Sequence, residues 1–505
     1  MIGANSEFGK KRADPTDLVG LREGLVGSDP EGLLSPLGLK RIEIGSNILD
    51  LLPECVANLT EGTRENPRIL LVADATRITR SGEDLKKLVE EILFERYDRV
   101  ERVVIGAHHA QLHADEEALA EAEAAVADAD CVVVVGSGTI TDICKVAVHR
   151  TGGGSLVVVQ TAASVDGFSD DVSVVLKSGV KRTIPSRWPD VLLSDLPTIS
   201  EAPFSMTAAG YGDAISMYTA PADWRLASLV GLDDSHHPAP VAMLLEGGPD
   251  VLGAAEGVGR LESESMEKLV RLLALRGIAS GVSGSTAILS GAEHLMSHML
   301  DMHAGQTGTP PGVHGAQVGV ATVIAAAAWQ TLLENLDPSK IDVDTCFPEP
   351  ENIEPIVREA FSGLDPTGAV GDECWRDYEQ KLSRWRDNRK AFESFLENWP
   401  RHRAELEELV AAPERLAEAL TLVGAPAKFE DLSPPISPET SRWALRNCHF
   451  MRNRFNVVDL LYFLGWWDDV FIERVSELAC QHFSQSASQQ KQKADRLTSE
   501  RSEAG

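Results

Sequence analysis

The stretch CVVVVGSGTITDICKVAVH (131–149) is the most informative local pattern in the sequence. Residues 131–135 are wholly apolar, which predicts a strand buried on both faces. The glycines at 136 and 138 then predict a tight turn, and residues 143–149 predict a helix. A buried strand that leads through a glycine-rich turn into a helix is typical of a parallel α/β sheet.

Similar units lie on both sides of this stretch. The apolar runs RILLVA (68–73), RVVIG (102–106) and SLVVVQ (155–160) predict three further strands, and the stretches 82–96 and 116–129 predict helices. Strands and helices of these lengths imply parallel β-α-β units with both sheet faces covered. We therefore expect an α/β fold that begins with a Rossmann-like parallel-sheet domain.

The chain is long enough for two domains, since it has 505 residues, of which 43% are hydrophobic. Strand patterns fade from about residue 199, where Ala-, Leu- and Glu-rich helical patterns take over. We predict an N-terminal extension over 1–39, the α/β domain over 40–198, a mainly helical domain over 199–483 and a polar tail over 484–505. The tail is nearly without large apolar residues, so we expect it to be disordered or a frayed helix.

The composition excludes several classes of function. There are 77 acidic and 47 basic residues, a formal net charge of -30, which argues against non-specific binding of nucleic acid. The seven cysteines are scattered without a CxxC pair, and the N-terminus has no apolar signal core, which favours a cytoplasmic protein with reduced thiols. The apolar run 318–333 is too short and too polar to span a bilayer, so we expect a core helix and no membrane insertion.

The turn between the central strand and its helix is a candidate phosphate site. Its backbone amides can approach a pyrophosphate at the helix N-terminus, although a tight turn without a ligand would have the same sequence. The pattern is not the usual GxGxxG fingerprint. Asp74 ends the 68–73 strand, where a carboxylate can accept from an adenosine ribose and favour NAD over NADP. In the alternative interpretation, Asp74 only caps the following loop or helix.

Three segments carry residues that bind divalent cations. They are AGYGD (209–213), SGAEHLMSH (290–298) and VHGAQVG (313–319). His294 and His298 are four residues apart, so a helix places both on one face, and His303 competes with either of them by spacing alone. Two imidazoles and a carboxylate suit zinc, nickel or iron. A histidine pair on a helix is also common in a hydrogen-bonded core without a metal.

Taken together, the motifs resemble the glycerol-1-phosphate dehydrogenase branch of the dehydroquinate-synthase-like, metal-dependent alcohol dehydrogenase superfamily. The resemblance spans about residues 39–468. The matching stretches, in order, are GSGTITDICK (136–145), QTAASVDGFS (160–169), GVKRTIPSRWPDVLLSDL (179–196), AAGYGDAISMYTAPADW (208–224), SGAEHLMSH (290–298), VHGAQVGV (313–320) and ALRNCHFMRNRFNVVDLLYFLGWW (444–467).

The resemblance implies roles for particular residues. Asp213, His294 and His314 would bind the metal, and Asp213 and His298 would act in catalysis beside the substrate. Asp166 would contact the substrate, and Lys181, with Arg182 beside it, is our candidate for its phosphate. The residues expected to bind the cofactor, together with Asp74, are Gly136, Ser137, Gly138, Thr139, Ile140, Thr161, Ala162, Ala163 and Ser164.

The implied reaction is the reversible, NAD(P)H-dependent and metal-assisted reduction of dihydroxyacetone phosphate to sn-glycerol 1-phosphate, by an enzyme that we expect to be a homo-oligomer. The alternatives are a related polyol dehydrogenase, a sugar-phosphate cyclase, or a non-catalytic relative that binds a ligand. GSGT replaces the family's GGGT. Asp170 stands where relatives carry a small hydroxyl residue near the cofactor, so the cofactor contact of that residue is not carried over to Asp170. Residues 337–376 and the tail make this chain longer than typical relatives.

Overall fold

The computed structural model describes residues 8, 12–108, 112–177 and 180–503. These residues form two compact units. We call residues up to 214 together with 237–285 the sheet unit, and residues 215–236 together with 286–503 the helical unit. The sheet unit therefore extends beyond the predicted 40–198 domain. Residues 237–285 join it because their long helix α11 (Ser263–Ser283) packs on β1, α6 and α7 of that unit.

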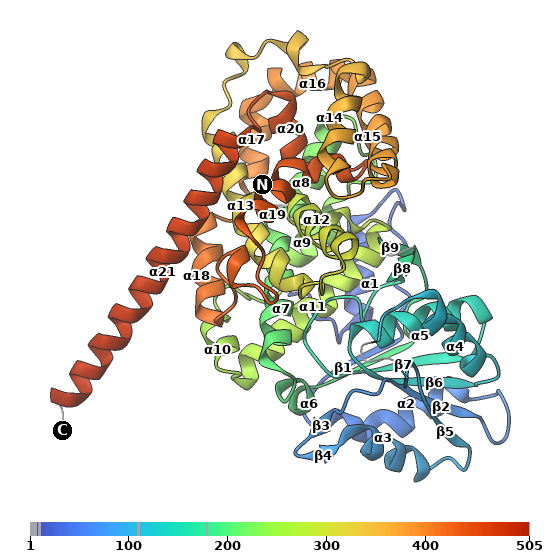
Figure 1. The fold of residues 1–505 in the computed structure, drawn as a ribbon. Coiled ribbons are helices and arrows are strands. Elements are labelled where there is room, and N and C mark those ends of the chain that lie inside the picture. The colour runs from blue at the N-terminus through green and yellow to red at the C-terminus, as the bar shows by residue number, and fades with distance from the viewer. Residues whose placement is uncertain (1–7, 9–11, 109–111, 178–179, 504–505) are drawn as a thin grey trace. The chain divides into compact units, whose positions relative to one another are not determined.

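The sheet unit contains a six-stranded parallel sheet, as predicted (Figure 1). In spatial order its strands are β1 (Arg41–Gly45), β10 (Val191–Asp195), β7 (Ser155–Gln160), β6 (Cys131–Gly136), β2 (Ile69–Ala73) and β5 (Val100–Val104). The inner strands β2 and β6 are buried at every residue, whereas the edge strand β1 alternates between buried and half-buried residues. This contrast follows from helices covering both faces of the middle of the sheet.

Helices cover the two faces in pairs. Side chains of α2 and α3 pack against Leu71, Val133 and Val159 in one core, and Figure 1 shows α4 and α5 on the opposite face. Asp84 accepts a hydrogen bond from the Lys87 amide and thereby begins α3. The helices of this unit are α1 (Leu18–Ser28), α2 (Leu52–Thr60), α3 (Leu85–Phe94), α4 (Glu116–Val126), α5 (Gly138–Thr151), α6 (Leu196–Ser200), α7 (Phe204–Ala214), α9 (Pro238–Leu245), α10 (Ala255–Gly259) and α11.

Two short hairpins lie outside the main sheet, and the sequence patterns did not indicate them. They pair β3 (Thr79–Arg80) with β4 (Glu83–Asp84), and β8 (Val172–Lys177) with β9 (Val180–Pro185). Lys181 and Arg182, the candidates for the substrate phosphate, lie in strand β9. The β8–β9 hairpin packs on α5 rather than extending the sheet.

The helical unit is built around α13 (His314–Asn335), which is longer than the run 318–333 and, contrary to the expectation for that run, is long and apolar enough to cross a membrane by length and composition alone. Of its most apolar window, 89% is buried, which confirms the prediction of a core helix for residues 318–333. Helices α12, α18, α20 and α21 pack on it. The helices of this unit are α8 (Ala220–Leu229), α12 (Ala292–Thr307), α13, α14 (Pro350–Ser362), α15 (Ala369–Asp387), α16 (Arg389–Glu397), α17 (Trp399–Glu407), α18 (Pro413–Val423), α19 (Pro438–Asn447), α20 (Val457–Phe463) and α21 (Asp469–Glu503).

In the polar tail, for which disorder and a frayed helix were both expected, α21 continues to Glu503. The residues after Ser484 are mostly Gln, Lys, Ala, Ser, Glu and Arg, and the helix contains neither proline nor glycine. Most of these residues have good helix propensity, so the backbone can remain helical without an apolar face.

Candidate cofactor and metal sites

The predicted cofactor residues collect at one edge of the sheet. From β2 the chain continues to β5 on one side, and from β6 it continues to β7 on the other side, so the connections diverge between β2 and β6. Ligands of open parallel sheets bind at the carboxyl ends of the strands at such a switch point. Asp74 directly follows β2, Gly136 ends β6 and Thr161 directly follows β7. The sequence-predicted residues therefore lie where this topology favours a nucleotide.

The glycine turn leaves the beginning of α5 open. Ser137 is the N-cap residue, but its side chain makes no capping hydrogen bond, so it does not pair the first amides of this 14-residue helix. A Cβ at Gly136 would overlap Ile140, and one at Gly138 would lie 3.0 Å from Val165. Neither glycine has a positive φ, so the turn requires their small size rather than a left-handed backbone. An anion can approach these amides and the positive end of the helix dipole.

The segment 161–164 lies beside this turn and against α7. The Thr161 amide donates to the Gly136 carbonyl at 3.3 Å, and residues 161–163 are buried. A Cβ at Gly210 would overlap the Ala163 carbonyl, so a glycine is needed for α7 to pack this closely on the segment. Asp213 lies one turn further along α7, which ties its position to the predicted cofactor segment.

Asp74 is engaged by its own loop. Its carboxylate accepts from the Thr76 amide at 3.1 Å and the Thr76 hydroxyl at 3.0 Å, and Lys86 lies 3.1 Å from Oδ1. These are the bonds of a loop cap, which was the alternative interpretation. The ribose contact of Asp74 stays a prediction.

The buried Arg276 joins two of the predicted site residues. It lies in α11 with no exposed surface, 3.1 Å from Asp166 Oδ2 and 3.6 Å from Asp213 Oδ1. It also donates to the Ala214 carbonyl at 2.9 Å, which fixes the end of α7. A buried guanidinium needs such acceptors to offset its desolvation, and the two carboxylates are held in place in return. The sequence patterns gave no indication of Arg276, which is 110 residues from Asp166.

Asp170 belongs to a buried ion pair rather than to an open surface. Lys145 contacts its carboxylate and also donates to the carbonyls of Gly167 and Val172. Burial raises the pKa of Asp170. Burial also raises the pKa of Asp142, to about 7, with a further contribution from Asp170 and an opposing one from Lys145. Asp170 therefore has a structural role as the buried partner of Lys145.

Two other candidates in the sheet unit are less informative. The side chain of Lys181 lies outside the described residues. Arg182 is half-buried in β9.

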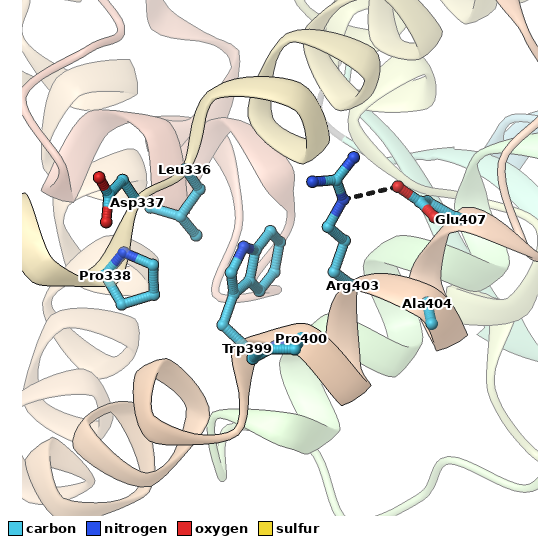
Figure 2. A pocket seen from close by; sticks show the side chains of 8 residues that line it. All are labelled: Leu336, Asp337, Pro338, Trp399, Pro400, Arg403, Ala404 and Glu407. Atoms are coloured by element: carbon cyan, nitrogen blue, oxygen red, sulfur yellow. Dashed lines mark hydrogen bonds and ion pairs between the residues drawn. The ribbon is translucent and has the colours of Figure 1, made fainter.

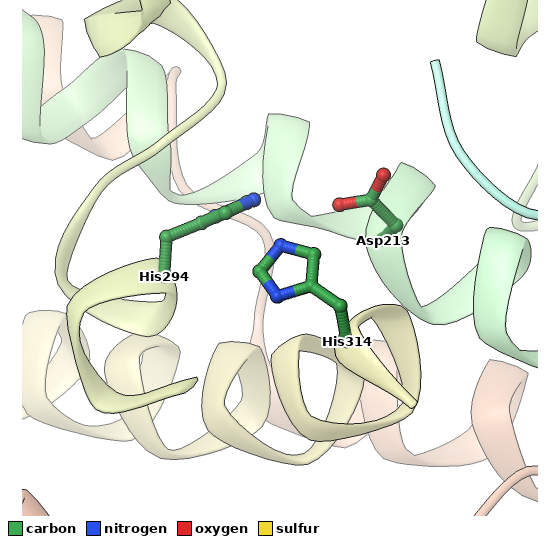
Figure 3. Close-up of side chains that lie close together, drawn as sticks. All are labelled: Asp213, His294 and His314. Carbon is green, nitrogen blue, oxygen red and sulfur yellow. The ribbon is translucent and has the colours of Figure 1, made fainter. Parts of the chain in front are cut away.

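In the helical unit, three histidines form a cluster. His294 and His298 project from consecutive turns of α12, as their spacing predicts, with ring centroids 6.3 Å apart. His314 begins α13, and its ring centroid is 5.3 Å from that of His294 and 5.4 Å from that of His298. Figure 3 shows the rings of His294 and His314 pointing toward each other. His303, the competitor by spacing, lies against Trp443 instead, with ring centroids 5.8 Å apart.

Hydrogen bonds determine which nitrogen two of these histidines present. His294 Nδ1 lies 2.9 Å from Glu293 Oε1, and a carboxylate can only accept, so Nδ1 carries the proton and Nε2 has the lone pair. Ser297 donates its one hydroxyl proton to Gln317 at 2.7 Å, so His314 Nδ1 donates to Ser297 at 3.0 Å. Both histidines therefore offer Nε2, and the partners of Nδ1 orient the rings as they do around metals.

The carboxylate beside His294 is itself well held. Glu293 has no exposed surface and accepts from the Gly291 amide at 2.7 Å and from Thr219 at 3.1 Å. A second buried carboxylate, Asp223, accepts from the amides of Ala292 and Val457. Burial, and then the neighbouring Glu293, raise the pKa of Asp223 well above its usual range. These bonds fix the first turn of α12 and with it the position of His294.

Two hollows of the helical unit lie apart from this cluster. One, of about 420 Å³, is lined by Trp399 and by the ion pair of Arg403 with Glu407 (Figure 2). The other, of about 1010 Å³, lies between α14 and α19 around Trp443. None of the predicted site residues whose side chains the structure describes lines either hollow.

Comparison with known proteins identifies the family. The family described as iron-containing alcohol dehydrogenase matches residues 43–203. The chain is 30% identical over 294 residues to glycerol-1-phosphate dehydrogenase (NAD(P)+) of Halalkalibacterium halodurans, covering 58% of this chain and 71% of the relative. It is also 30% identical over 304 residues to the Pyrococcus abyssi protein of the same name, covering 59% and 82%.

Solved structures agree with this at the level of the fold. Glycerol dehydrogenase of Schizosaccharomyces pombe matches with a TM-score of 0.54 at 15% sequence identity, over 90% of this chain and 92% of that one. The fold is thus that of the dehydroquinate-synthase-like alcohol dehydrogenases, as predicted. From its sequence relatives, this chain belongs to the glycerol-1-phosphate dehydrogenase family of oxidoreductases.

Proposed function

We propose that the protein reduces dihydroxyacetone phosphate to sn-glycerol 1-phosphate with NADH or NADPH. The observation that carries the chemistry is the pair His294 and His314, each with Nδ1 bonded to the protein, so that the lone pair able to bind a cation is on Nε2. The family supports the proposed substrate, since its members in the comparison are named glycerol-1-phosphate dehydrogenase.

The proposed metal ligands are Asp213, His294 and His314, whose side chains are drawn in Figure 3. Two neutral imidazoles and one carboxylate are a donor set that suits zinc, nickel or iron. Asp213 is buried at the end of α7, where Arg276 and the packing of Gly210 restrict its position. A cation bound there supplies Lewis acidity to a carbonyl oxygen.

The proposed cofactor site is the switch-point edge of the sheet. The open N-terminus of α5, at residues 136–140, receives the pyrophosphate, and residues 161–164 contact the cofactor further along. Asp74 contacts the ribose in this proposal. The reduced nicotinamide supplies the hydride.

The remaining roles belong to substrate residues. Asp166, oriented by Arg276, hydrogen-bonds the substrate, and Lys181 with Arg182 contacts the phosphate. His298, beside His314, gives a proton to the product oxygen, and Asp213 lies next to the reacting carbon. We also propose that the enzyme acts in the cytoplasm as a homo-oligomer, which light scattering on the purified protein checks.

The test is a spectrophotometric assay of NADH and NADPH oxidation after metal reconstitution, with chiral analysis of the product. We expect kcat/KM for dihydroxyacetone phosphate to exceed that for dihydroxyacetone by at least about a hundredfold, or roughly 2.7 kcal/mol. One or two charge-assisted hydrogen bonds to the phosphate can supply this free energy. Equal activity on dihydroxyacetone or glycerol would indicate a polyol dehydrogenase. Inactivity on both, with metal and cofactor bound, would contradict the proposed substrate.

A further inference from the structure

One face of α12 carries more potential metal ligands than the proposed metal site uses. His294, His298 and Asp301 follow one another at spacings of four and three residues, so a helix aligns them along one stripe. The ligand-type atoms of His298, Asp301 and His314 lie within 4.8 Å of one another, and all three residues are half-buried. All three belong to the helical unit, so this group is complete without Asp213.

We propose that His298, Asp301 and His314 form a second site for a divalent transition-metal cation such as zinc. Its donors are again two imidazoles and one carboxylate, the types that zinc prefers. Neighbouring donors of a tetrahedral zinc ion lie roughly 3.4 Å apart, as follows from bond lengths of about 2.1 Å. Small side-chain rotations therefore suffice to bring the three atoms onto one ion.

The second site and the proposed catalytic site exclude each other. His314 donates its Nδ1 proton to Ser297, so it has a single lone pair, on Nε2, and one lone pair binds one ion. We therefore expect one tightly bound ion per chain. It occupies either the site that contains His294 or the site that contains His298, which is about one helical turn further along α12. One consequence rests on the proposed function, in which His298 gives a proton to the product. An ion at the second site occupies His298 and therefore makes the enzyme inactive.

The test is calorimetric titration of the metal-free full-length protein with zinc chloride. We compare wild type with Asp213→Asn, Asp301→Asn and the double variant, all nearly isosteric changes, with folding checked by circular dichroism. Asp213→Asn should still bind one zinc ion, and adding Asp301→Asn should raise its Kd at least tenfold. In the matched control, Asp387→Asn is added to Asp213→Asn in place of Asp301→Asn. Asp387 is exposed and belongs to the same unit, so this change should leave the zinc Kd of Asp213→Asn unchanged.

Three results would overturn the second site. They are complete loss of zinc from Asp213→Asn alone, a change of less than tenfold on adding Asp301→Asn, and two tightly bound ions in the wild type, the last because it contradicts a site that shares His314 with the first. Because the titration needs neither cofactor nor substrate, its outcome is independent of the reaction. A protein that reduces dihydroxyacetone phosphate but gives one of these results keeps its proposed function, and an inactive protein that titrates as expected keeps the second site.

Discussion

Replacing Glu293 by glutamine should weaken metal binding without weakening the fold. The amide can keep every bond of the carboxylate, because Oε1 can still accept from His294 and Gly291 while Nε2 donates to Thr219. What changes is the charge. A hydrogen bond to a charged acceptor contributes about 1.5–3 kcal/mol and one to a neutral acceptor about 1 kcal/mol, so the imidazole loses about 0.5–2 kcal/mol of support. This predicts a zinc Kd that is roughly 2–30-fold higher.

The stability of the metal-free protein should change in the opposite direction. Glu293 is one reason why the pKa of the buried Asp223 is raised, so a neutral side chain at 293 relieves repulsion between two buried carboxylates. We therefore expect the free energy of unfolding of the metal-free Glu293→Gln protein to equal or exceed that of the wild type.

The assay combines zinc titration with urea unfolding of the metal-free protein. Glu334→Gln is the matched control, because that glutamate is exposed and far along α13 from His314. An unchanged zinc Kd in Glu293→Gln, with the fold intact, would show that Glu293 does not support a metal ligand. A large loss of stability would instead show that the carboxylate charge is needed by the fold.

Three further changes test other parts of the structure. His314→Ala should lower zinc affinity and turnover by more than about 100-fold while cofactor affinity stays nearly unchanged, because both metal positions lose a ligand; an active, metal-replete variant would contradict the assignment. Gly138→Val should raise the cofactor Kd about tenfold in fluorescence titrations, since even a Cβ there would lie 3.0 Å from Val165 and block the approach to the helix N-terminus. Asp142→Asn should flatten the pH dependence of the free energy of unfolding. The pKa of Asp142 is raised from 3.8 to about 7 in the folded protein, so the protonated carboxyl stabilises the fold at low pH. This stabilisation is lost as the pH rises through about 7, with a slope of up to about 1.4 kcal/mol per pH unit. Urea unfolding between pH 4 and pH 8 checks the slope, and parallel curves for variant and wild type would contradict it.

The parts of the fold that the sequence predicted are those that local patterns determine. Strands β2, β6 and β7 are apolar at nearly every position, and the helices between them follow within a few residues of the expected bounds. The β8–β9 hairpin was missed because its alternation is short and its partner is α5 rather than the sheet. The assignment of residues 237–285 to the sheet unit was missed because it depends on which distant elements α11 packs against.

The candidate site likewise contains residues that local patterns predict and residues that they do not. The spacing of His294 and His298 predicted one helix face, but only the resemblance distinguished His314 as a ligand. Gln317 was open to prediction, since it is three residues after His314 and so lies on the same side of α13. Glu293 was not, because side chains one residue apart on a helix do not normally face each other, and its contact with His294 depends on the first turn of α12.

Arg276 shows what local pattern reading cannot reach in this chain. In the sequence it is one basic residue in a helix that also contains Lys268 and Arg271, each of which pairs with a glutamate four residues earlier on the same helix. Only the packing of α11 distinguishes it, because it brings the guanidinium to Asp166 and to the end of α7. Its charge is offset by the carboxylates that the proposal assigns to substrate and metal, so removing it would disturb both together. The residue on which the sheet-unit half of the proposed active site depends most is therefore one that no motif contains.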